Sequence, residues 1–583
     1  MRKRTNKTGT LPKVPLLIAL FIGLIIIVLA CVKAPALLER YTPSEERMEL
    51  TDYYKITDNS QIAITLNHDV LDTYGISIDG HIYLDYKFVH DNLNSLFYWD
   101  ANEHLLLYTT ASDIITIKID SASYTIGKTT NNYERTIAKI NGDSVWIDID
   151  FVKNYSDFIY TTYENPSRIV IYNAWEEITT ATVKKDTQLR DKGGIKRPIL
   201  KDIHQNDVVT ILETDDKWTK VCTNDGVSGY ILSKYVKDIK QTTPVSEFVP
   251  EQFSHIQVDK SINMIWHQLY GSSSGAQAIN LLQNSKTVNV VSPTWFRISN
   301  NNGAISSIAS HDYVAYCHEQ GVQVWGLVTN VDSPNVDVIS LLTHTSSRQN
   351  LINQLIAKAI EYRLDGINVD FEQMNEQQIG DAYIQFIREL SVRCEKNNII
   401  LSVDVPIPAS YNDLYHYTEL GLFADYVVVM AYDEHYGQKS GEGSVASLNW
   451  TEDAINNLLA EDVSANQIVF GIPFYTKLWN LTPTSTEESN NTSYIIGFEN
   501  MGMDSARKWM NENVTEPVWL ENCGQYYGEC TKDGKIYKLW LEDATSLEKR
   551  LQLMKKYELG GAAFWKFGFE NSSAWDVILK YFS

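Results

Sequence analysis

Cysteine is scarce in this sequence, and the spacing of the few cysteines excludes two common frameworks. The 583 residues contain six of them, at positions 31, 222, 317, 394, 523 and 530. They are too sparse for a disulfide scaffold, and none forms a CxxC pair suited to zinc. Cys523 and Cys530 are close enough in sequence to bridge if they face each other across a hairpin. Two free thiols are the alternative.

Basic residues are also in short supply. Lysine and arginine number 50 against 73 aspartates and glutamates, which gives a formal net charge of -23. Such a surface repels the phosphates of nucleic acids and of anionic lipids, so neither is an expected partner. A neutral polymer fits better. The hydrophobic fraction of 44% indicates globular folding, and the length requires several domains.

Metal-binding and nucleotide-binding motifs are missing as well. The sequence has no HExxH and no EF-hand pattern, and its twelve histidines do not cluster. The stretch Gly271-Ser-Ser-Ser-Gly275 lacks the Lys-Ser/Thr pair of a phosphate-binding loop. We therefore expect no metal and no cofactor.

The one long apolar run is at the N-terminus, from Val14 to Val32, and Lys33 closes it. About 19 residues at a rise of about 1.5 Å each are long enough to cross a bilayer. The run follows five basic residues, at positions 2, 3, 4, 7 and 13. This flank predicts a cytoplasmic tail over 1–13, a transmembrane helix over 14–33, and an extracytoplasmic remainder. The alternative is a signal peptide cleaved near 34–36, which would leave a secreted protein.

After a polar stalk, residues 53–173 contain an internal repeat whose two copies lie about 63 residues apart. Each copy has a short strand, a small helix-like segment and a later closing strand: 80–89 with 105–108, and 143–152 with 169–172. The pattern predicts a small duplicated α+β domain. It resembles the copper amine oxidase N-terminal-like domain of bacterial surface proteins. That resemblance implies a surface or cell-wall contact role, without a copper site.

Residues 178–240 show short alternating runs between turn residues. Five strands are expected, around 182–183, 188–190, 207–212, 218–221 and 229–232. With Trp218 and the Gly229-Tyr230 pair, the segment resembles a bacterial SH3-like domain, a small β-barrel that in its family grips cell-wall peptide or glycan. A structural spacer, in which Trp218 and Tyr230 fill a small core, is the alternative. A linker rich in Thr, Pro, Ser and Glu follows over 241–256.

From 257 to 583, apolar β-runs alternate with helix-length amphipathic stretches. Eight strands are expected at 262–266, 288–291, 322–328, 366–372, 399–405, 426–431, 468–474 and 561–566. Residues 351–360 have the i, i+3/i+4 spacing of a helix between the third and fourth strands. This alternation predicts a TIM barrel, in which active residues lie at the carboxyl ends of the strands.

The chemistry is concentrated on the fourth expected strand, Asp365-Gly-Ile-Asn-Val-Asp-Phe-Glu372. Because side chains alternate along a strand, Asn368, Asp370 and Glu372 share one face, and the apolar residues between them share the other. The apolar face suits packing against outer helices, so the polar face is expected to line the barrel axis. Buried neighbouring carboxyls raise one another's pKa, so one of them can stay protonated and act as a general acid.

This strand resembles the DxxDxDxE signature of glycoside hydrolase family 18, with Asn368 in the second aspartate position. Three further segments fit the family: 430–433, 471–475 and 562–565. The segment 538–543 and the appended small domains look most like bacterial cell-wall and spore-cortex lytic enzymes. The resemblance covers the whole C-terminal region.

The resemblance implies substrate-assisted, retaining hydrolysis, in which Glu372 protonates the glycosidic oxygen and the substrate's own acetamido group is the nucleophile. Asp370 would orient the acetamido N–H, and Tyr432 would bind its carbonyl oxygen. The expected substrate contacts are Asn368, Asp433, Trp565, Trp295 and Tyr475, with Trp565 as the floor of the site.

Other residues on these strands have less defined roles. Asp365 is expected to be structural, and Asp404 points inward by alternation without an assigned role. Asn368 can hydrogen-bond but cannot share a proton, so we expect a simplified proton cycle. Phe296 and Trp479 could stack on sugars or simply pack.

Three functions remain open from the sequence. The leading hypothesis is a hydrolase of N-acetylglucosamine bonds in peptidoglycan, held near the wall by its anchor and accessory domains. The second is a chitinase or endo-acting enzyme on chitooligosaccharides. The third is a non-catalytic, wall-binding protein on the same barrel, which the presence of Glu372 disfavours.

Overall fold

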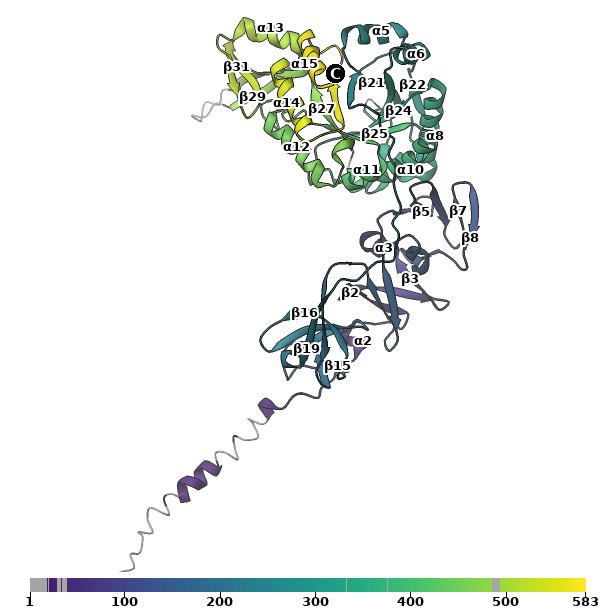
Figure 1. The fold of residues 1–583 in the computed structure, drawn as a ribbon, viewed down its shortest axis with the longest axis vertical. Coiled ribbons are helices and arrows are strands. Elements are labelled where there is room, and N and C mark those ends of the chain that lie inside the picture. Colours follow the sequence, from purple (N-terminus) through teal and green to yellow (C-terminus); the bar gives the residue numbers. More distant parts are fainter. Residues whose placement is uncertain are drawn as a thin grey trace, which may run out of the picture. The chain divides into compact units, whose positions relative to one another are not determined.

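The computed structural model describes residues 18, 20–28, 33, 39–331, 333–374, 376–484 and 493–582. The chain divides into two compact units, Met1–Ser95 with Lys139–Pro250, and Leu96–Ala138 with Glu251–Ser583. Figure 1 labels the elements of both. The segment 53–173, which the repeat predicts as one module, therefore contributes to both units.

The predicted cytoplasmic tail, 1–13, lies outside the described residues, as do residues 14–17, 19 and 29–32 of the predicted transmembrane span. Residues 20–28 are helical. Among the residues that the structure describes, no helix is long and apolar enough to cross a membrane.

The first unit contains the strand–helix halves of the repeat. Strand β3 (His81–Asp85) leads into α3 (Tyr86–Asn92), and β10 (Ser144–Asp148) leads into α4 (Ile149–Lys153). Asp85 and Asp148 each cap the helix that follows, accepting from the backbone N–H of Lys87 and of Phe151. The two strands pair antiparallel, so the copies lie side by side. The closing strands differ: β12 (Arg168–Tyr172) joins this sheet, whereas β5 (Leu105–Thr109) belongs to the other unit.

The sheet that contains the repeat has seven strands among the described residues, in the order β11-β12-β1-β2-β3-β10-β9. Its remaining strands are β1 (Gln61–Leu66), β2 (Asp69–Ile78), β9 (Ala138–Asn141) and β11 (Ile159–Tyr163).

A second sheet of the first unit covers the segment that resembles an SH3-like domain. Its order is β15-β14-β18-β17-β16-β13-β19. The strands are β13 (Ile178–Val183), β14 (Thr187–Arg190), β15 (Ile199–Ile203), β16 (Val208–Thr214), β17 (Trp218–Thr223), β18 (Ser228–Leu232) and β19 (Val236–Thr242). The described residues thus form seven strands where five were expected. The two missed strands are β15, whose short run was passed over, and β19, which is mostly polar and exposed and gives no alternation signal.

In the second unit, eight parallel strands of the described chain form a closed barrel, because β20 pairs with both β21 and β33. They are β20 (Ile262–His267), β21 (Val290–Ile298), β23 (Gln323–Thr329), β24 (Gly366–Asp370), β25 (Ile400–Val405), β26 (Tyr426–Met430), β27 (Ile468–Pro473) and β33 (Gly561–Trp565). The predicted TIM barrel is confirmed, and every expected strand lies within a few residues of its predicted position.

Helices follow the barrel strands. The principal ones are α5 (Gly275–Asn284), α6 (His311–Glu319), α8 (Thr345–Tyr362), α10 (Ala382–Lys396), α11 (Tyr417–Phe423), α12 (Leu448–Ala460), α14 (Ala544–Lys556) and α15 (Ser572–Phe582). Helix α8 contains the predicted helical segment 351–360.

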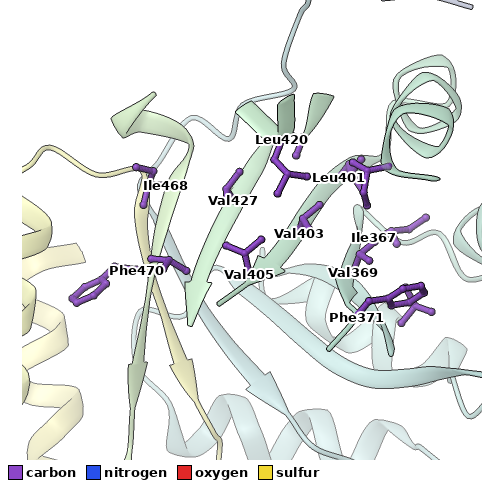
Figure 2. Packing of buried hydrophobic residues seen from close by; sticks show 14 of the residues in the cluster. Ile367, Val369, Phe371, Leu401, Val403, Val405, Leu420, Val427, Ile468 and Phe470 are labelled. Atoms are coloured by element: carbon purple, nitrogen blue, oxygen red, sulfur yellow. The ribbon is translucent and has the colours of Figure 1, made fainter. Parts of the chain in front are cut away.

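The two faces of the barrel strands separate as the alternation predicts. Ile367, Val369 and Phe371 pack outward in the same cluster as the helices, and Figure 2 shows them beside Leu401 and Val403 of the next strand. A separate buried cluster fills the barrel interior, with Met264, Trp266, Trp325, Leu327 and Val428 among its members. The interior is therefore a packed core, and the few polar side chains within it, such as Asn368 and Ser402, lie below the acids at its carboxyl end.

An antiparallel sheet is inserted between β27 and β33. Its order is β29-β28-β32-β31-β30, and the strands are β28 (Tyr475–Thr484), β29 (Ser493–Gly502), β30 (Val518–Leu520), β31 (Gln525–Lys532) and β32 (Lys535–Leu541). Cys523 precedes β31 and Cys530 lies within it, opposite Tyr537. Both thiols are free, and the residue opposite Cys530 in the β31–β32 hairpin is Tyr537, so Cys523 and Cys530 do not face each other across it.

A small sheet from early in the chain belongs to the barrel unit. It runs β4 (Phe97–Asp100), β5, β6 (Ile114–Lys118), β7 (Ser123–Ile126) and β8 (Thr129–Asn132). Asp100 is buried and accepts hydrogen bonds from the backbone N–H and the hydroxyl of Thr345, at 2.6 and 2.5 Å, at the start of α8. Arg348 lies 4.9 Å from the ring centre of Tyr98 and pairs with Glu389 of α10 at 3.0 Å. The small sheet thus completes the polar contacts of two barrel helices.

We expect Asp100→Ala to destabilise the barrel unit. The substitution leaves two buried donors of Thr345 without their acceptor, which costs at least about 2 kcal/mol. Chemical denaturation measures the loss. Asp576→Asn is the matched control, because this exposed carboxylate pairs only with exposed Lys286 and should change stability by less than about 1 kcal/mol. Equal effects of the two substitutions would contradict the importance of this contact.

Candidate active site

Strand β24 delivers three polar residues to the barrel axis. Asn368 is fully buried, Asp370 ends the strand, and Glu372 lies two residues beyond it. The oxygen of the Asn368 amide accepts from the indole N–H of Trp266 at 3.1 Å and from the hydroxyl of Ser292 at 2.8 Å. Its amide nitrogen donates to Asp404 at 2.7 Å. The inward orientation of this face agrees with the prediction from alternation.

A cavity of about 150 Å³ opens at this end of the barrel. It is lined by Trp266, Asp370, Glu372, Asp404, Met430, Tyr432, Asp433, Tyr475 and Trp565. Six of these are residues that the sequence singled out for the site. Three others, Trp266, Met430 and Asp404, had no assigned role. The structure therefore brings residues from six barrel strands, or from just after them, to one small space.

Burial and mutual repulsion shape the acidity of this cluster. Burial, then the neighbouring Asp404 and Glu372, raise the pKa of Asp370 well above its usual range, although a hydrogen bond from Thr329 opposes the shift. Burial and the nearby Asp433 raise the pKa of Glu372. Burial raises the pKa of Asp404 to about 8, with Glu372 adding to the effect and Asn368 and Trp266 opposing it. A carboxyl that stays protonated near neutrality is what a general acid requires.

Asp433 is held by the inserted sheet. The hydroxyl of Tyr475 donates to its Oδ1 at 2.7 Å, and the buried ammonium of Lys477 forms an ion pair with the same oxygen. Half of the Asp433 side chain remains exposed. Tyr475, at the start of β28, therefore orients Asp433 in addition to lining the cavity.

Aromatic rings form the floor of the cavity. Trp565 ends β33, and its ring centre lies 5.7 Å from that of Trp266 in an edge-to-face arrangement. Trp266 also lies edge to face with Tyr432, at 6.4 Å. Polarised C–H groups of a sugar pack well against such faces.

Some residues singled out from the sequence lie elsewhere. Trp295 is fully buried against Tyr313, 5.1 Å between ring centres, and Phe296 packs in the same core. Trp479 is buried, and its indole donates to the carbonyl of Gly443. None of the three lines the cavity. Asp365 accepts from the backbone of Val324 at 2.7 Å and contacts His318, which fits its predicted structural role.

Two positioning residues were missed by the sequence analysis. Asn330, just after β23, pairs its amide with both backbone groups of Glu372: its nitrogen donates to the carbonyl at 2.7 Å, and its oxygen accepts from the N–H at 2.8 Å. The hydroxyl of Tyr415 donates to the carbonyl of Phe371 at 2.7 Å. Both residues hydrogen-bond to the backbone of Phe371 and Glu372, which lies beyond the end of β24 and no longer pairs with the neighbouring strands. Such contacts leave no periodic signal in a sequence.

In the described part of the chain, no cluster of three or more His, Cys, Asp or Glu side chains is placed to hold a metal ion. The cavity is lined by carboxyls, phenols, indoles and the thioether of Met430.

The fold is a closed (β/α)₈ barrel, and its site has acids at the carboxyl ends of the strands with tryptophans beneath them. This combination defines a barrel glycosidase. The model of the family described as Glycosyl hydrolases family 18 matches residues 331–570. The C-terminal part of the chain is thus a family 18 glycosyl hydrolase domain.

Three relatives among curated proteins each match slightly less than half of the chain. The chain is 26% identical over 291 residues to "Uncharacterized glycosylase YvbX" of Bacillus subtilis (strain 168), covering 48% of this chain and 80% of that protein. It is 24% identical over 267 residues to "Cortical fragment-lytic enzyme" of Bacillus anthracis, covering 44% of this chain and 59% of that protein. It is 22% identical to "Di-N-acetylchitobiase" of Rattus norvegicus, covering 44% and 72%.

Among solved structures, the C-terminal domain of a putative chitinase from Desulfitobacterium hafniense DCB-2 aligns with a TM-score of 0.48 at 18% identity. The alignment covers 56% of this chain and 99% of that one.

We expect Asn330→Ala to lower kcat by about 10- to 100-fold with little change in KM. The substitution frees the backbone of the acid, and a displacement of about 1 Å is enough for such a loss. Steady-state kinetics on a glycan substrate measure both constants. Asn350→Ala, which removes an exposed hydrogen bond to Asn302, is the control and should leave kcat unchanged. A normal kcat for Asn330→Ala would contradict the positioning role.

Proposed function

We propose that this protein is a membrane-anchored, extracytoplasmic glycosidase that cleaves β-1,4 bonds next to N-acetylglucosamine in peptidoglycan. The observation that carries the proposal is the convergence of Asp370, Glu372, Tyr432 and Trp565 on one cavity, with the pKa values of both carboxyls raised. A binding protein has no use for buried acids in this state, and their burial is costly.

The geometry supports the substrate-assisted mechanism. Glu372, protonated in the free site, donates its proton to the glycosidic oxygen. The carbonyl oxygen of the substrate's 2-acetamido group attacks the anomeric carbon as the leaving group departs, which gives an oxazolinium intermediate. Asp370 accepts a hydrogen bond from the acetamido N–H and offsets its positive charge, and Tyr432 donates to the carbonyl oxygen. Glu372 then takes a proton from water, which opens the intermediate with net retention.

The choice of peptidoglycan rests on two kinds of support. A relative that matches 44% of this chain is named as a cortical fragment-lytic enzyme. The first unit also resembles surface and wall-contact modules in its sequence, and its second sheet has a cavity of about 500 Å³ lined by Trp218 and Tyr235 among others. A chitooligosaccharide is the second candidate, which the similarity to a di-N-acetylchitobiase favours.

The proposed hydrolysis is tested on purified peptidoglycan, on chitooligosaccharides and on a de-N-acetylated chitooligosaccharide. We expect release of muropeptides from the first, and no turnover of the third, because it lacks the acetamido nucleophile. Glu372→Gln should lower the rate by more than about 1000-fold while the protein stays folded. Cleavage of the de-N-acetylated substrate, or near-normal turnover by Glu372→Gln, would refute the mechanism. Cleavage of chitooligosaccharides but not of peptidoglycan would make chitooligosaccharides, rather than peptidoglycan, the substrate.

Anchoring through residues 14–33 predicts that the full chain fractionates with membranes, resists high salt and is released by detergent, whereas a chain beginning at Tyr41 stays soluble. Cell fractionation and sequencing of the mature N-terminus measure this. A mature N-terminus beyond residue 34 would show that the segment is a cleaved signal.

A further inference from the structure

Asp404 belongs to the cavity, and the proposed mechanism gives it no part. It lies on β25, is 1% exposed and lines the same space as Asp370 and Glu372. The parallel register of β24 and β25 sets Val369 beside Val403, so the next residues, Asp370 and Asp404, lie level on adjacent strands. Both side chains point into the barrel.

A hydrogen-bond chain fixes which atom of Asp404 is free. An indole N–H can only donate, so the Asn368 oxygen is the atom that faces Trp266 and the hydroxyl of Ser292. The Asn368 nitrogen must then face Asp404, where it donates to Oδ1 at 2.7 Å. Within the described residues, the second oxygen, Oδ2, is buried and has no hydrogen-bond partner. A buried charged oxygen without a donor is expensive, whereas an O–H at that position can donate.

Apart from the neutral amide of Asn368 and the neutral indole of Trp266, the groups that face Asp404 are all titratable acids. They are Asp370 and Glu372 from the end of β24, Tyr432 after β26, and Tyr383 from α10. No ion pair involves Asp404 in the part of the chain that the structure describes. With no cation to offset them, two adjacent buried carboxyls cannot both ionise at neutral pH. Burial raises the pKa of both Asp370 and Asp404, which agrees with one proton held between them, and the unpaired Oδ2 of Asp404 is the atom placed to carry it.

We propose that Asp404 holds a proton on Oδ2 and donates it in a hydrogen bond to Asp370, so that the pair shares one negative charge. Asp404 is thus a positioning residue. It keeps Asp370 ionised and directed at the acetamido N–H of the substrate, and it remains neutral through the cycle. The effect of Asp404 on catalysis rests on the proposed function. The position of its proton does not, because it is a property of the free protein.

The asparagine at 368 then has a clear reason. Its amide cannot take up an acidic proton. It donates one N–H to Asp404 and accepts two hydrogen bonds on its oxygen, so the acidic proton stays on Asp404, which donates it in a hydrogen bond to Asp370. The sequence suggested that a carboxyl was missing from the cycle at this position. The structure supplies one from the neighbouring strand.

The effect on pH dependence has a definite sign. An O–H donor to a carboxylate is stronger than an amide N–H donor, so Asp404 lowers the pH at which Asp370 ionises relative to a site with asparagine there. In Asp404→Asn, the acid limb of the kcat/KM profile should move up by about one pH unit. The alkaline limb, set by Glu372, should move much less.

The experiment compares pH profiles of wild type, Asp404→Asn and Ser402→Ala. Ser402 lies on the same strand and face, two residues earlier, and is fully buried, so its substitution tests for a merely structural disturbance. We expect the acid limb to shift in Asp404→Asn alone. The exchange variant Asn368→Asp with Asp404→Asn should return the limb toward wild type, because it restores one protonated carboxyl next to Asp370.

Infrared spectroscopy of the free protein locates the proton without any substrate. At pH 7 the band of a protonated carboxyl should be present in wild type and in Ser402→Ala, and should lose intensity in Asp404→Asn. An unshifted acid limb in Asp404→Asn, or an unchanged band, would overturn the proposal. If wild type cleaves none of the glycans, the proposed function fails, and the infrared comparison still decides where the proton lies.

Discussion

Three carboxyl groups lie together at the carboxyl end of this barrel, and no cation of the described chain contacts them. In water each would be charged, but here burial and mutual repulsion raise the pKa of all three. The surrounding structure has to accommodate that cost. It does so through hydrogen bonds to individual side-chain oxygens: Asn368 donates to Asp404, Thr329 donates to Asp370, and Trp266 donates to Asn368. The same arrangement produces an acid that can give up a proton near neutrality, so the energetic cost and the chemistry have one origin.

Accurate placement of the acid depends on backbone that no longer belongs to the sheet. Strand β24 ends at Asp370, and the next residues run free of the ladder. Asn330, just after β23, and Tyr415, in a short 3-10 helix, replace the lost ladder bonds, one on each side of the Phe371–Glu372 peptide. Asp433 is also held in place by distant residues, because Tyr475 and Lys477 of the inserted sheet bind one of its oxygens. Rigid elements from several parts of the chain thus hold the reacting groups, as a preorganised site requires.

The barrel is also supported from outside. Asp100 and Tyr98, more than 240 residues before α8, contact its first turn through Thr345 and Arg348. Arg348 is fully buried and pairs with Glu389, and such a pair is tolerated only when its other hydrogen bonds are satisfied. The carbonyl of Leu342 and the hydroxyl of Thr345 provide those partners. A segment that looks like part of an accessory module in the sequence is therefore part of the catalytic unit.

The sequence by itself determined the barrel and the residues of its fourth strand. Eight apolar runs that alternate with amphipathic helices favour a closed barrel of parallel strands, and period-two alternation assigns Asn368, Asp370 and Glu372 to one face. Tyr432, Asp433 and Trp565, at the ends of β26 and β33, came instead from segments that resemble the glycosidase family. Tertiary structure alone decided the partners that come from distant elements. Asn330, Tyr415 and Lys477 act through contacts with no fixed sequence spacing. Trp295 looked like a sugar platform, but it is packed in the core. The role of Asp404 depends on how two strands stand in register, which is a property of the closed barrel and is not encoded in either strand alone.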